Sequence, residues 1–158
     1  MIKIKATQTK SYPSWQDYRE IFADDDDDEA FDSAWSELTG EDVEDPANRS
    51  QLLGWPDVIQ NSMFEECDLD TQGFYLGDGD GWNKVPKDIR KSAEETSRDR
   101  WMILFQLDIV ESDDFELMSG DCGHIYFYIT KEDLKEGIFD RIWLILSDYE
   151  IELSIKKG

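Results

Sequence analysis

The sequence is poor in cysteine and histidine and has no long hydrophobic run, and these shortages exclude several classes of protein. Its two cysteines, Cys67 and Cys122, lie far apart and outside any Cys-x-x-Cys pair, which predicts neither a disulfide framework nor a zinc site. No run of about 18 apolar residues is present, so we expect no membrane-spanning helix. The first ten residues alternate and lack the apolar stretch of a signal peptide. These absences favour a cytoplasmic location.

Basic residues are scarce in the first half of the chain. Residues 11–82 hold 21 acidic side chains and only two basic ones, Arg19 and Arg49, for a net charge of −19, whereas the whole chain carries −22. Such a field repels nucleic acids and anionic membrane surfaces, and it attracts basic proteins and cations. We therefore expect no direct binding of nucleic acid and no membrane partner. Solubility is the plain alternative explanation of the charge.

What is present is an aromatic-rich sequence long enough for one folded domain. At 158 residues, 13% of them aromatic, the chain can bury a sizeable core. The stretches 101–110, 124–129 and 142–146 read as strands, and helices lie between clusters of strands rather than in strict alternation. This pattern predicts an α+β fold: a single domain over residues 1–158, with a mostly antiparallel sheet, a few short helices and an acidic N-terminal segment, 1–50.

Local signals place the helices and the longest loop. Apolar residues at helical spacing predict helices at residues 14–23 and 28–39. Helical propensity after Pro86 predicts a third at 87–98, and capping signals predict a fourth at 130–137. The first of them begins with Ser14 and Asp17 at the spacing of a capping box. Residues 65–83 are polar and rich in glycine, which predicts a long mobile loop. Alternation predicts short strands near residues 2–6 and 149–156.

The stretch Trp101–Val110 is apolar on both faces. One face carries Trp101, Ile103, Phe105, Leu107 and Ile109 at period two, and the other carries Met102, Leu104 and Val110. A strand that is apolar on both faces belongs in the middle of a sheet that is covered on both sides. This strand is therefore expected to organise the core.

The single histidine is the obvious candidate for catalysis. His124 lies close to Cys122 and Asp121, which are the residue types of a nucleophilic site. Neighbours two positions apart on a strand lack the orienting geometry of a triad, so we expect no enzyme and no cofactor. Tyr126 and Tyr128 share the face of His124 and read as half-buried packing or as part of a contact surface.

Two acidic stretches have several interpretations. The run Asp24–Glu29 is a solvated charged segment, a docking surface for a basic partner or, least favoured, part of a metal site. The stretch Asp68–Gly73 begins like a calcium-binding loop, but Gly79 stands where that loop needs its bidentate glutamate. The ordinary interpretation of the second stretch is an Asp/Gly turn, and no metal site is predicted.

Three segments in order resemble one family. They are Leu52-Leu53-Gly54-Trp55-Pro56 with Ile59-Gln60, then Leu104-Phe105-Gln106-Leu107-Asp108, then Gly120-Asp121-Cys122-Gly123 with Ile125-Tyr126-Phe127. Together they are similar to the YwqG-like family of bacterial proteins over residues 50–150. The resemblance implies an α+β fold without established enzymatic activity, and a kinship with immunity proteins encoded beside secreted toxins. Typical members are longer, and the acidic segment 1–50 departs from their pattern.

These observations predict a non-enzymatic binding protein, most concretely an immunity protein that neutralises a cognate basic toxin domain through an acidic surface. The alternative is a small-ligand or cation-binding regulatory domain with its site in residues 65–83. Aromatic residues that could supply contact hot spots are Trp35, Trp55, Phe74, Tyr75 and Trp82. The residues predicted to contact the partner are Asp24, Asp25, Asp26, Asp27, Asp28, Glu29, Asp68, Asp70, Asp78, Asp80 and Trp82.

Overall fold

The computed structural model describes residues 5–22, 28–40, 50–58, 62–77, 80–108, 110–112, 115–117 and 123–147. Its helices are α1 (Trp15–Phe22), α2 (Asp28–Thr39), α3 (Phe64–Thr71), α4 (Gly81–Lys84), α5 (Lys87–Arg100) and α6 (Lys131–Glu136). Its strands are β1 (Gln51–Leu52), β2 (Trp101–Leu107), β3 (Val110–Ser112), β4 (Phe115–Leu117), β5 (His124–Thr130) and β6 (Trp143–Ser147). None of the described helices is long and apolar enough to cross a membrane.

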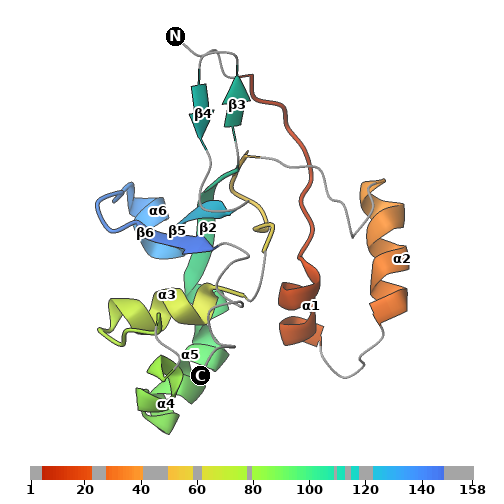
Figure 1. Ribbon diagram of the computed structural model, residues 1–158. Helices are drawn as coiled ribbons and strands as arrows, with labels where there is room; N and C mark the ends of the chain where they lie inside the picture. Colours follow the sequence, from red (N-terminus) through yellow and green to blue (C-terminus); the bar gives the residue numbers. More distant parts are fainter. Residues whose placement is uncertain are drawn as a thin grey trace, which may run out of the picture.

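A four-stranded sheet in the order β1-β2-β5-β6 forms the centre of the molecule, and β3 and β4 pair as a separate hairpin (Figure 1). All pairings are antiparallel. The predicted α+β fold is therefore confirmed: a single domain with an antiparallel sheet and several helices. The central place of β2 is confirmed as well, because β1 and β5 pair with its two edges.

A β-bulge in β2 changes which side chains face the core. Ile103 pairs with Tyr128, whereas Phe105 already pairs with Phe127, so Leu104 is one residue too many opposite β5. An extra residue of this kind reverses the alternation of the strand beyond it.

Gln106 shows the consequence of the bulge. Its side chain is fully buried on the core face, where its Oε1 accepts a hydrogen bond from the backbone N–H of Asp57 at 2.8 Å. The predicted face that continued from Ile103 through Phe105 and Leu107 is therefore wrong beyond Ile103. The cause is the bulge, which the period-two pattern of the strand does not signal.

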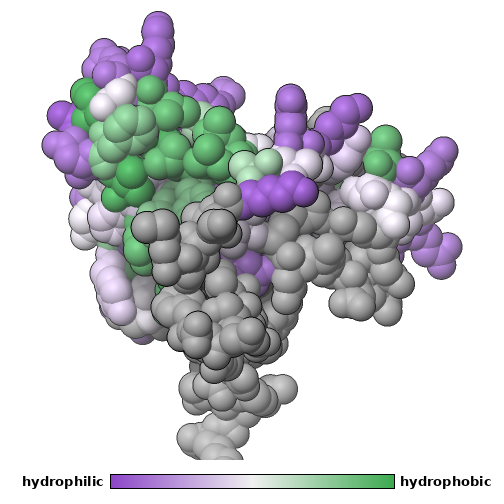
Figure 2. All heavy atoms as spheres, turned by 90° about the horizontal axis from the view of Figure 1, so that it is seen from above, coloured by the Kyte–Doolittle hydropathy of each residue, from purple (hydrophilic) through white to green (hydrophobic). Residues whose placement is uncertain are grey.

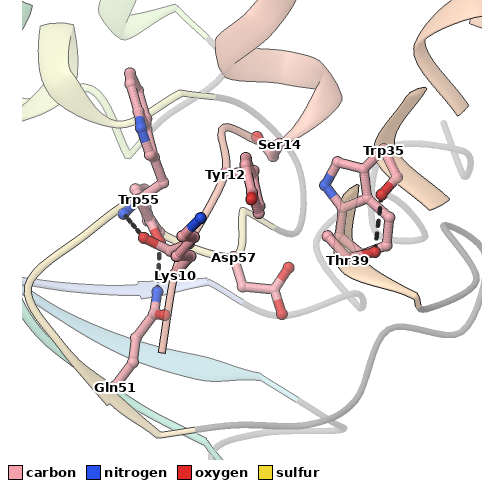
Figure 3. A pocket seen from close by; sticks show the side chains of 10 residues that line it. Lys10, Tyr12, Ser14, Trp35, Thr39, Gln51, Trp55 and Asp57 are labelled. Carbon is pink, nitrogen blue, oxygen red and sulfur yellow. Dashed lines mark hydrogen bonds between the residues drawn. The ribbon is translucent and has the colours of Figure 1, made fainter. Parts of the chain in front are cut away.

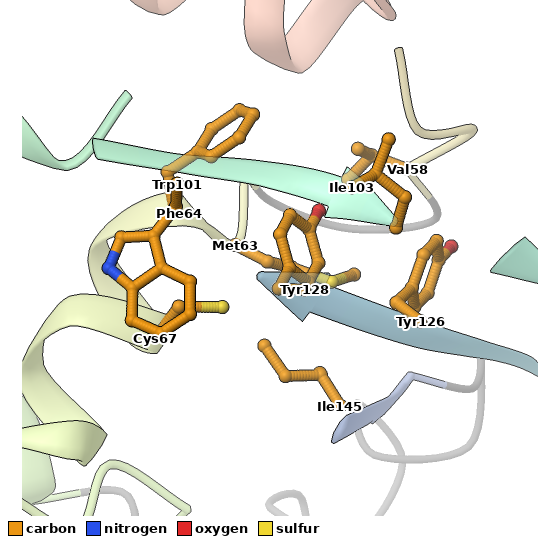
Figure 4. Close-up of a cluster of buried hydrophobic side chains, with 9 residues drawn as sticks. All are labelled: Val58, Met63, Phe64, Cys67, Trp101, Ile103, Tyr126, Tyr128 and Ile145. Atoms are coloured by element: carbon orange, nitrogen blue, oxygen red, sulfur yellow. The ribbon is translucent and has the colours of Figure 1, made fainter. Parts of the chain in front are cut away.

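The main core lies between one face of the sheet and α3 (Figure 4). Its buried members are Val58, Met63, Phe64, Cys67, Trp101, Ile103, Tyr126, Tyr128 and Ile145. Tyr126 and Tyr128 are fully buried, so their interpretation as half-buried packing or contact surface is wrong. Full burial of a large aromatic side chain stabilises a fold by about 2–3 kcal/mol, which makes these two rings principal supports of the sheet.

Residues 65–83 do not form the long loop that was predicted, because α3 occupies 64–71 and α4 occupies 81–84. Phe64 and Cys67 lie one helical turn apart and both enter the main core. Leu69 anchors the other side of α3 in a second cluster under α5. The acidic residues and glycines of this stretch favour a loop in the sequence, but the helical spacing of its apolar residues favours the helix that is observed.

The other predicted helices are confirmed to within a few residues at α1, α2, α5 and α6. Thr130 caps α6 by accepting a hydrogen bond from the backbone N–H of Asp133 at 3.0 Å. Gly137 ends this helix at φ 73°, in the left-handed region that favours glycine. The strand predicted at 149–156 lies outside the described residues, as does most of the one at 2–6. Lys5 and Ala6 are exposed and have no regular structure.

The helices α1 and α2 form a pair, here called the arm, that lies to one side of the sheet (Figure 1). Aromatic rings join the two helices: the ring centroid of Phe31 lies 5.0 Å from those of both Trp15 and Tyr18. Phe31 is the one described residue of α2 that is buried. From Glu29 to Thr39, the other side chains of α2 are exposed or half-buried.

Candidate functional site

The arm is attached to the domain through the segment before α1. The hydroxyl of Ser11 accepts a hydrogen bond from the backbone N–H of Trp55 at 2.9 Å. Gly54 permits this close approach, because it adopts φ 90° and a Cβ at this position would collide with the Ser11 side chain. Ser11 and the turn at 54–57 thus place the start of α1 beside β1.

Asp17 of α1 is the second attachment of the arm. Its carboxylate is fully buried and accepts a hydrogen bond from the Ser14 hydroxyl at 3.3 Å. That hydroxyl also accepts from the Asp17 backbone N–H at 3.2 Å, which is the first of the two bonds of the predicted capping box. Burial raises the pKa of Asp17, while neighbouring hydroxyl groups and the charge of Arg98 on α5 oppose the rise. The buried carboxylate of Asp17 thus lies within electrostatic reach of Arg98 in the central domain.

A small cavity, here called the arm pocket, lies between the arm and the domain (Figure 3). Its volume is about 40 Å³. The lining residues are Lys10, Ser11, Tyr12, Ser14, Trp35, Thr39, Gln51, Trp55, Pro56 and Asp57. They come from the segment before α1, from α2, from β1 and from the turn that follows β1.

The arm pocket combines aromatic rings with a carboxylate. Figure 3 shows Trp35 of α2 across from Tyr12, with the Asp57 carboxylate pointing toward the space between them. The Trp55 indole points away and packs against the main core, so this residue lines the pocket mainly with its backbone. Aromatic faces beside a carboxylate form an environment that favours a cation, such as the end of a lysine or arginine side chain. Lys10, which is exposed, also lies at the rim.

The outward surface of α2 extends this site with acidic side chains. α2 contains four acidic residues and no basic one. Glu29, Asp32 and Glu37 are all exposed, and none of them takes part in an ion pair within the described part of the chain. Of the predicted contact residues, Glu29 thus belongs to this surface. Asp28 begins α2, and Asp24–Asp27 lie outside the described residues.

Asp68 and Asp70 lie on α3 and not in a loop. Asp68 is buried, and its Oδ1 accepts hydrogen bonds from the Arg100 guanidinium at 2.7 Å and from the Trp101 indole N–H at 3.1 Å. The calcium-loop interpretation of 68–73 is wrong, because a helix cannot converge the side chains at positions 1, 3 and 5 on one ion. Asp68 instead joins α3 to the start of β2.

The remaining predicted contact residues are distributed over the α3–α5 region. Asp80 is exposed, just before α4, and Asp78 lies outside the described residues. Trp82 is half-buried in the second hydrophobic cluster, and the Arg90 guanidinium lies 5.4 Å from the centroid of its ring. Trp82 therefore has a clear role within the fold.

Three acidic side chains of α3, those of Glu65, Glu66 and Asp70, have raised pKa values. Burial raises the pKa of Glu66 to about 7, and the charge of Asp70 adds to the rise. Burial also raises the pKa of Glu65 and of Asp70. In the described part of the chain, no three His, Cys, Asp or Glu side chains are grouped in a way that could hold a metal ion. Burial is the main cause of each of these raised pKa values.

His124 is buried, and both of its ring nitrogens have partners. Its Nε2 lies 3.0 Å from Oδ1 of Asp108, and its Nδ1 lies 3.1 Å from the hydroxyl of Tyr126. That hydroxyl donates to the backbone carbonyl of Asp57 at 2.6 Å. This geometry leaves no nitrogen of His124 to activate a nucleophile. Cys122 lies outside the described residues.

Sequence reasoning missed two residues of the arm pocket, Tyr12 and Asp57. It had named Trp35 and Trp55 as possible hot spots, but on separate segments of the chain. The hydrogen bond from the Trp55 N–H to Ser11 attaches the segment before α1 to this turn, and the ring contacts of Phe31 attach α2 to α1. The turn signal at Gly54 was the available clue, because such a turn often permits a close approach of another chain segment.

The fold and the site define a small single-domain α+β protein with an acidic helical arm. The chain belongs to the family described as a domain of unknown function (DUF1963), whose model matches residues 1–147. This match includes the acidic segment 1–50, which the resemblance had left outside the family pattern. No curated protein and no solved structure gives a significant match to the chain.

Proposed function

We propose that this protein is a non-enzymatic binding protein whose arm captures a basic protein. Within the family, we place it among YwqG-like bacterial immunity proteins that neutralise a cognate basic toxin domain in the cytoplasm. The observation that carries the proposal is the exposed face of α2, where Glu29, Asp32 and Glu37 lie without basic neighbours on the helix. Acidic surfaces of this kind accelerate association with basic partners.

The arm pocket supplies the specific contact within this acidic surface. Its aromatic rings and the Asp57 carboxylate suit one lysine or arginine side chain of the partner. A side chain that is inserted among aromatic residues and shielded from water is a common source of binding energy in protein interfaces. The exposed acids would then steer the partner, whereas Tyr12, Trp35 and Asp57 would hold it.

The test is affinity capture from the native cell, at low and at moderate salt, with three forms of the protein. The first form is the wild type, and the second carries Glu29→Gln, Asp32→Asn and Glu37→Gln on α2. The third is a matched control that removes the same charge from α5. Its substitutions are Asp88→Asn, Glu94→Gln and Asp99→Asn, all at exposed positions.

One basic protein that is retained by the wild type and by the α5 control, but lost by the α2 variant, would support the proposal. The captured protein would then be purified and titrated, and we expect its dissociation constant to rise at least about 10-fold in the α2 variant and in Trp35→Ala. Equal retention by all three forms would show that the acids serve solubility and that the interface lies elsewhere.

A second candidate function is the binding of a small organic cation in the arm pocket by a regulatory domain. The observation that favours it is the same pairing of aromatic rings with Asp57 in a small pocket of about 40 Å³. A ligand that binds only the folded state raises its melting temperature. Both functions place a cation in the arm pocket, so thermal scans with methylated ammonium ions are read together with the affinity capture. A shift with these ions and no captured protein supports this second function, whereas a captured basic protein supports the first.

A further inference from the structure

The sheet buries polar side chains on its core face and leaves apolar ones on the opposite face, here called the outer face. Gln106, His124 and Tyr126 are buried, although each has a polar group that loses contact with water on folding. By the hydrophobic effect alone, Phe105 and Phe127 would take these places, yet they lie on the outer face and are only half-buried. Polar groups that occupy a core in this way are typical of functional sites.

The outer face is partly open to solvent. Leu52 is 69% exposed and Leu144 is 53% exposed, although the strand register places both in one row with Phe105 and Phe127. Figure 2 shows hydrophobic residues gathered on the side of the molecule where β6 and α6 lie. The prediction that β2 is covered on both sides is therefore wrong for this face, within the part of the chain that the structure describes. Apolar side chains of these strands thus remain outside while polar ones occupy the core.

The buried polar side chains converge on the backbone of Asp57, whose carboxylate lines the arm pocket. Gln106 accepts a hydrogen bond from the backbone N–H of Asp57 at 2.8 Å, and Tyr126 donates one to its carbonyl at 2.6 Å. Gln106 and Tyr126 are paired across β2 and β5, and the β-bulge at Leu104 brings Gln106 to the core face. These two side chains, here called the clamp, therefore hold Asp57 at both of its backbone groups.

The hydrogen bonds of the clamp also fix the protons of His124. A hydroxyl has one proton, and Tyr126 donates it to the Asp57 carbonyl, which can only accept. The Tyr126 oxygen must therefore accept from Nδ1 of His124, 3.1 Å away, so Nδ1 carries a proton. Nε2 lies 3.0 Å from Oδ1 of Asp108, and a proton lies between these two atoms as well, because two lone pairs at this distance repel each other. The His124–Asp108 pair thus holds one proton more than a neutral imidazole beside a carboxylate.

Loss of this extra proton at higher pH reverses one hydrogen bond. The neutral imidazole keeps one N–H, and the Asp108 carboxylate holds it at Nε2, because a charged acceptor forms the stronger bond. Nδ1 then becomes an acceptor and takes the hydroxyl proton of Tyr126, which removes this donor from the Asp57 carbonyl. In the described part of the chain, Asp108 and Tyr126 are the titratable groups in contact with the imidazole, and Ser147, its neighbour on β6, is uncharged.

We propose that the clamp positions Asp57 for the arm pocket and that the extra proton of the His124–Asp108 pair controls this positioning. With the proton present, Asp57 is held at both backbone groups and its carboxylate points toward the pocket (Figure 3). Without it, one of the two bonds is lost and the carboxylate is less firmly placed. The effect on affinity rests on the proposed function, in which this carboxylate receives a cationic side chain. The dissociation constant of the basic partner should rise about 5-fold as the proton is lost, the usual effect of one hydrogen bond.

The test observes the clamp directly by nuclear magnetic resonance and needs no partner. His124 is the only histidine of the chain, so its ring nitrogens give the only imidazole signals of the untagged protein. Spectra are recorded from about pH 5 to about pH 9, a range that includes the ordinary charge change of histidine. The ring should pass from protons on both nitrogens to one proton on Nε2. The carbon signal of the Asp57 carbonyl and the indole N–H signal of Trp35 should shift with the same midpoint.

Two variants on the same strand separate the clamp from general effects of pH. Tyr126→Phe removes the hydroxyl that links the imidazole to Asp57, so the ring should still lose its proton while the Asp57 and Trp35 signals no longer follow it. Tyr128→Phe is the matched control, because Tyr128 is also fully buried and its hydroxyl has no hydrogen-bond partner among the described residues. This control should keep the wild-type response of all three signals.

Three results would overturn the proposal, and the first two need only the wild type. A ring that carries a single proton throughout, or keeps both protons to about pH 9, has no proton to control the clamp in this range. Asp57 and Trp35 signals that do not follow the ring would show that the pocket is independent of it. A response that persists in Tyr126→Phe would show that the hydroxyl does not transmit the change. If the clamp responds as expected but no partner is captured, the proposed function alone fails.

Discussion

His124 and Asp108 form a buried pair that ties β5 to the end of β2, with 3.0 Å between Nε2 of the imidazole and Oδ1 of the carboxylate. Tyr126 continues the network from Nδ1 of His124 to the backbone carbonyl of Asp57. The single histidine of the chain therefore links the sheet to the turn that lines the arm pocket. Its role is structural, in contrast to the catalytic role that its residue type suggests.

We expect Asp108→Asn to lower the free energy of unfolding by about 2–3 kcal/mol, because it removes the charged acceptor of a buried histidine. Urea denaturation at neutral pH measures the loss. Tyr126→Phe is the milder comparison and should cost about 1–2 kcal/mol, since it keeps the ring and removes the two hydrogen bonds of the hydroxyl, to His124 and to the Asp57 carbonyl. If both variants unfold within about 0.5 kcal/mol of the wild type, the network does not support the fold.

Asp68 and Asp80 are both predicted contact residues, but Asp68 is buried in the structure and Asp80 is exposed. We expect Asp68→Asn to cost about 2 kcal/mol, because the Arg100 guanidinium and the Trp101 indole lose a charged, buried acceptor. Asp80→Asn should leave the free energy of unfolding within about 0.5 kcal/mol of the wild type, since Asp80 is exposed. Chemical denaturation of the two variants side by side checks both statements. Equal costs would contradict this assignment of roles.

Stability should fall as the pH rises through neutrality. Burial raises the pKa of Glu66 from its ordinary value of 4.5 to about 7, so between these values the folded state binds more protons than the unfolded state. The free energy of unfolding therefore decreases from about pH 5 to about pH 8. Allowing for partial exposure of the side chain, the contribution of Glu66 is about 2 kcal/mol.

Glu66→Gln tests this assignment, because glutamine keeps the shape of the side chain and cannot ionise. Urea denaturation at several pH values should show the variant gaining about 2 kcal/mol over the wild type at pH 8, and little at pH 5. Glu65 and Asp70 have pKa values that are raised in the same direction and remain in both proteins. The difference between the two curves therefore isolates Glu66, and parallel curves would refute its raised pKa.

Calcium should not stabilise the protein specifically. Asp68 and Asp70 lie on a helix, and the buried carboxylate of Asp68 already forms an ion pair with the Arg100 guanidinium. Melting temperatures in millimolar calcium and in sodium chloride of equal ionic strength should agree within about 1 °C, because only a ligand with a site in the folded state shifts the equilibrium. A larger rise that Asp70→Asn abolishes would restore the cation-binding hypothesis for this region.

The sequence alone predicted four helices correctly, because their determinants are local. The capping box of Ser14 with Asp17 and the stop at Gly137 act within one or two turns of backbone. It failed at α3, where acidic residues and nearby glycines outweighed the spacing of Phe64 and Cys67. This spacing stabilises a helix only when the sheet provides an apolar surface on which Phe64 and Cys67 can pack.

The amino-acid sequence by itself therefore determined the class of fold, the central strand, the local starts and stops of helices, and the concentration of negative charge before residue 83. These properties depend on composition and on neighbours within a few positions. Tertiary structure decided that Gln106 rather than Phe105 enters the core, that Trp35 and Asp57 meet in one pocket, and that Leu52 and Leu144 share an open face. Each of these follows from strand register and from contacts between distant segments, which no local pattern encodes.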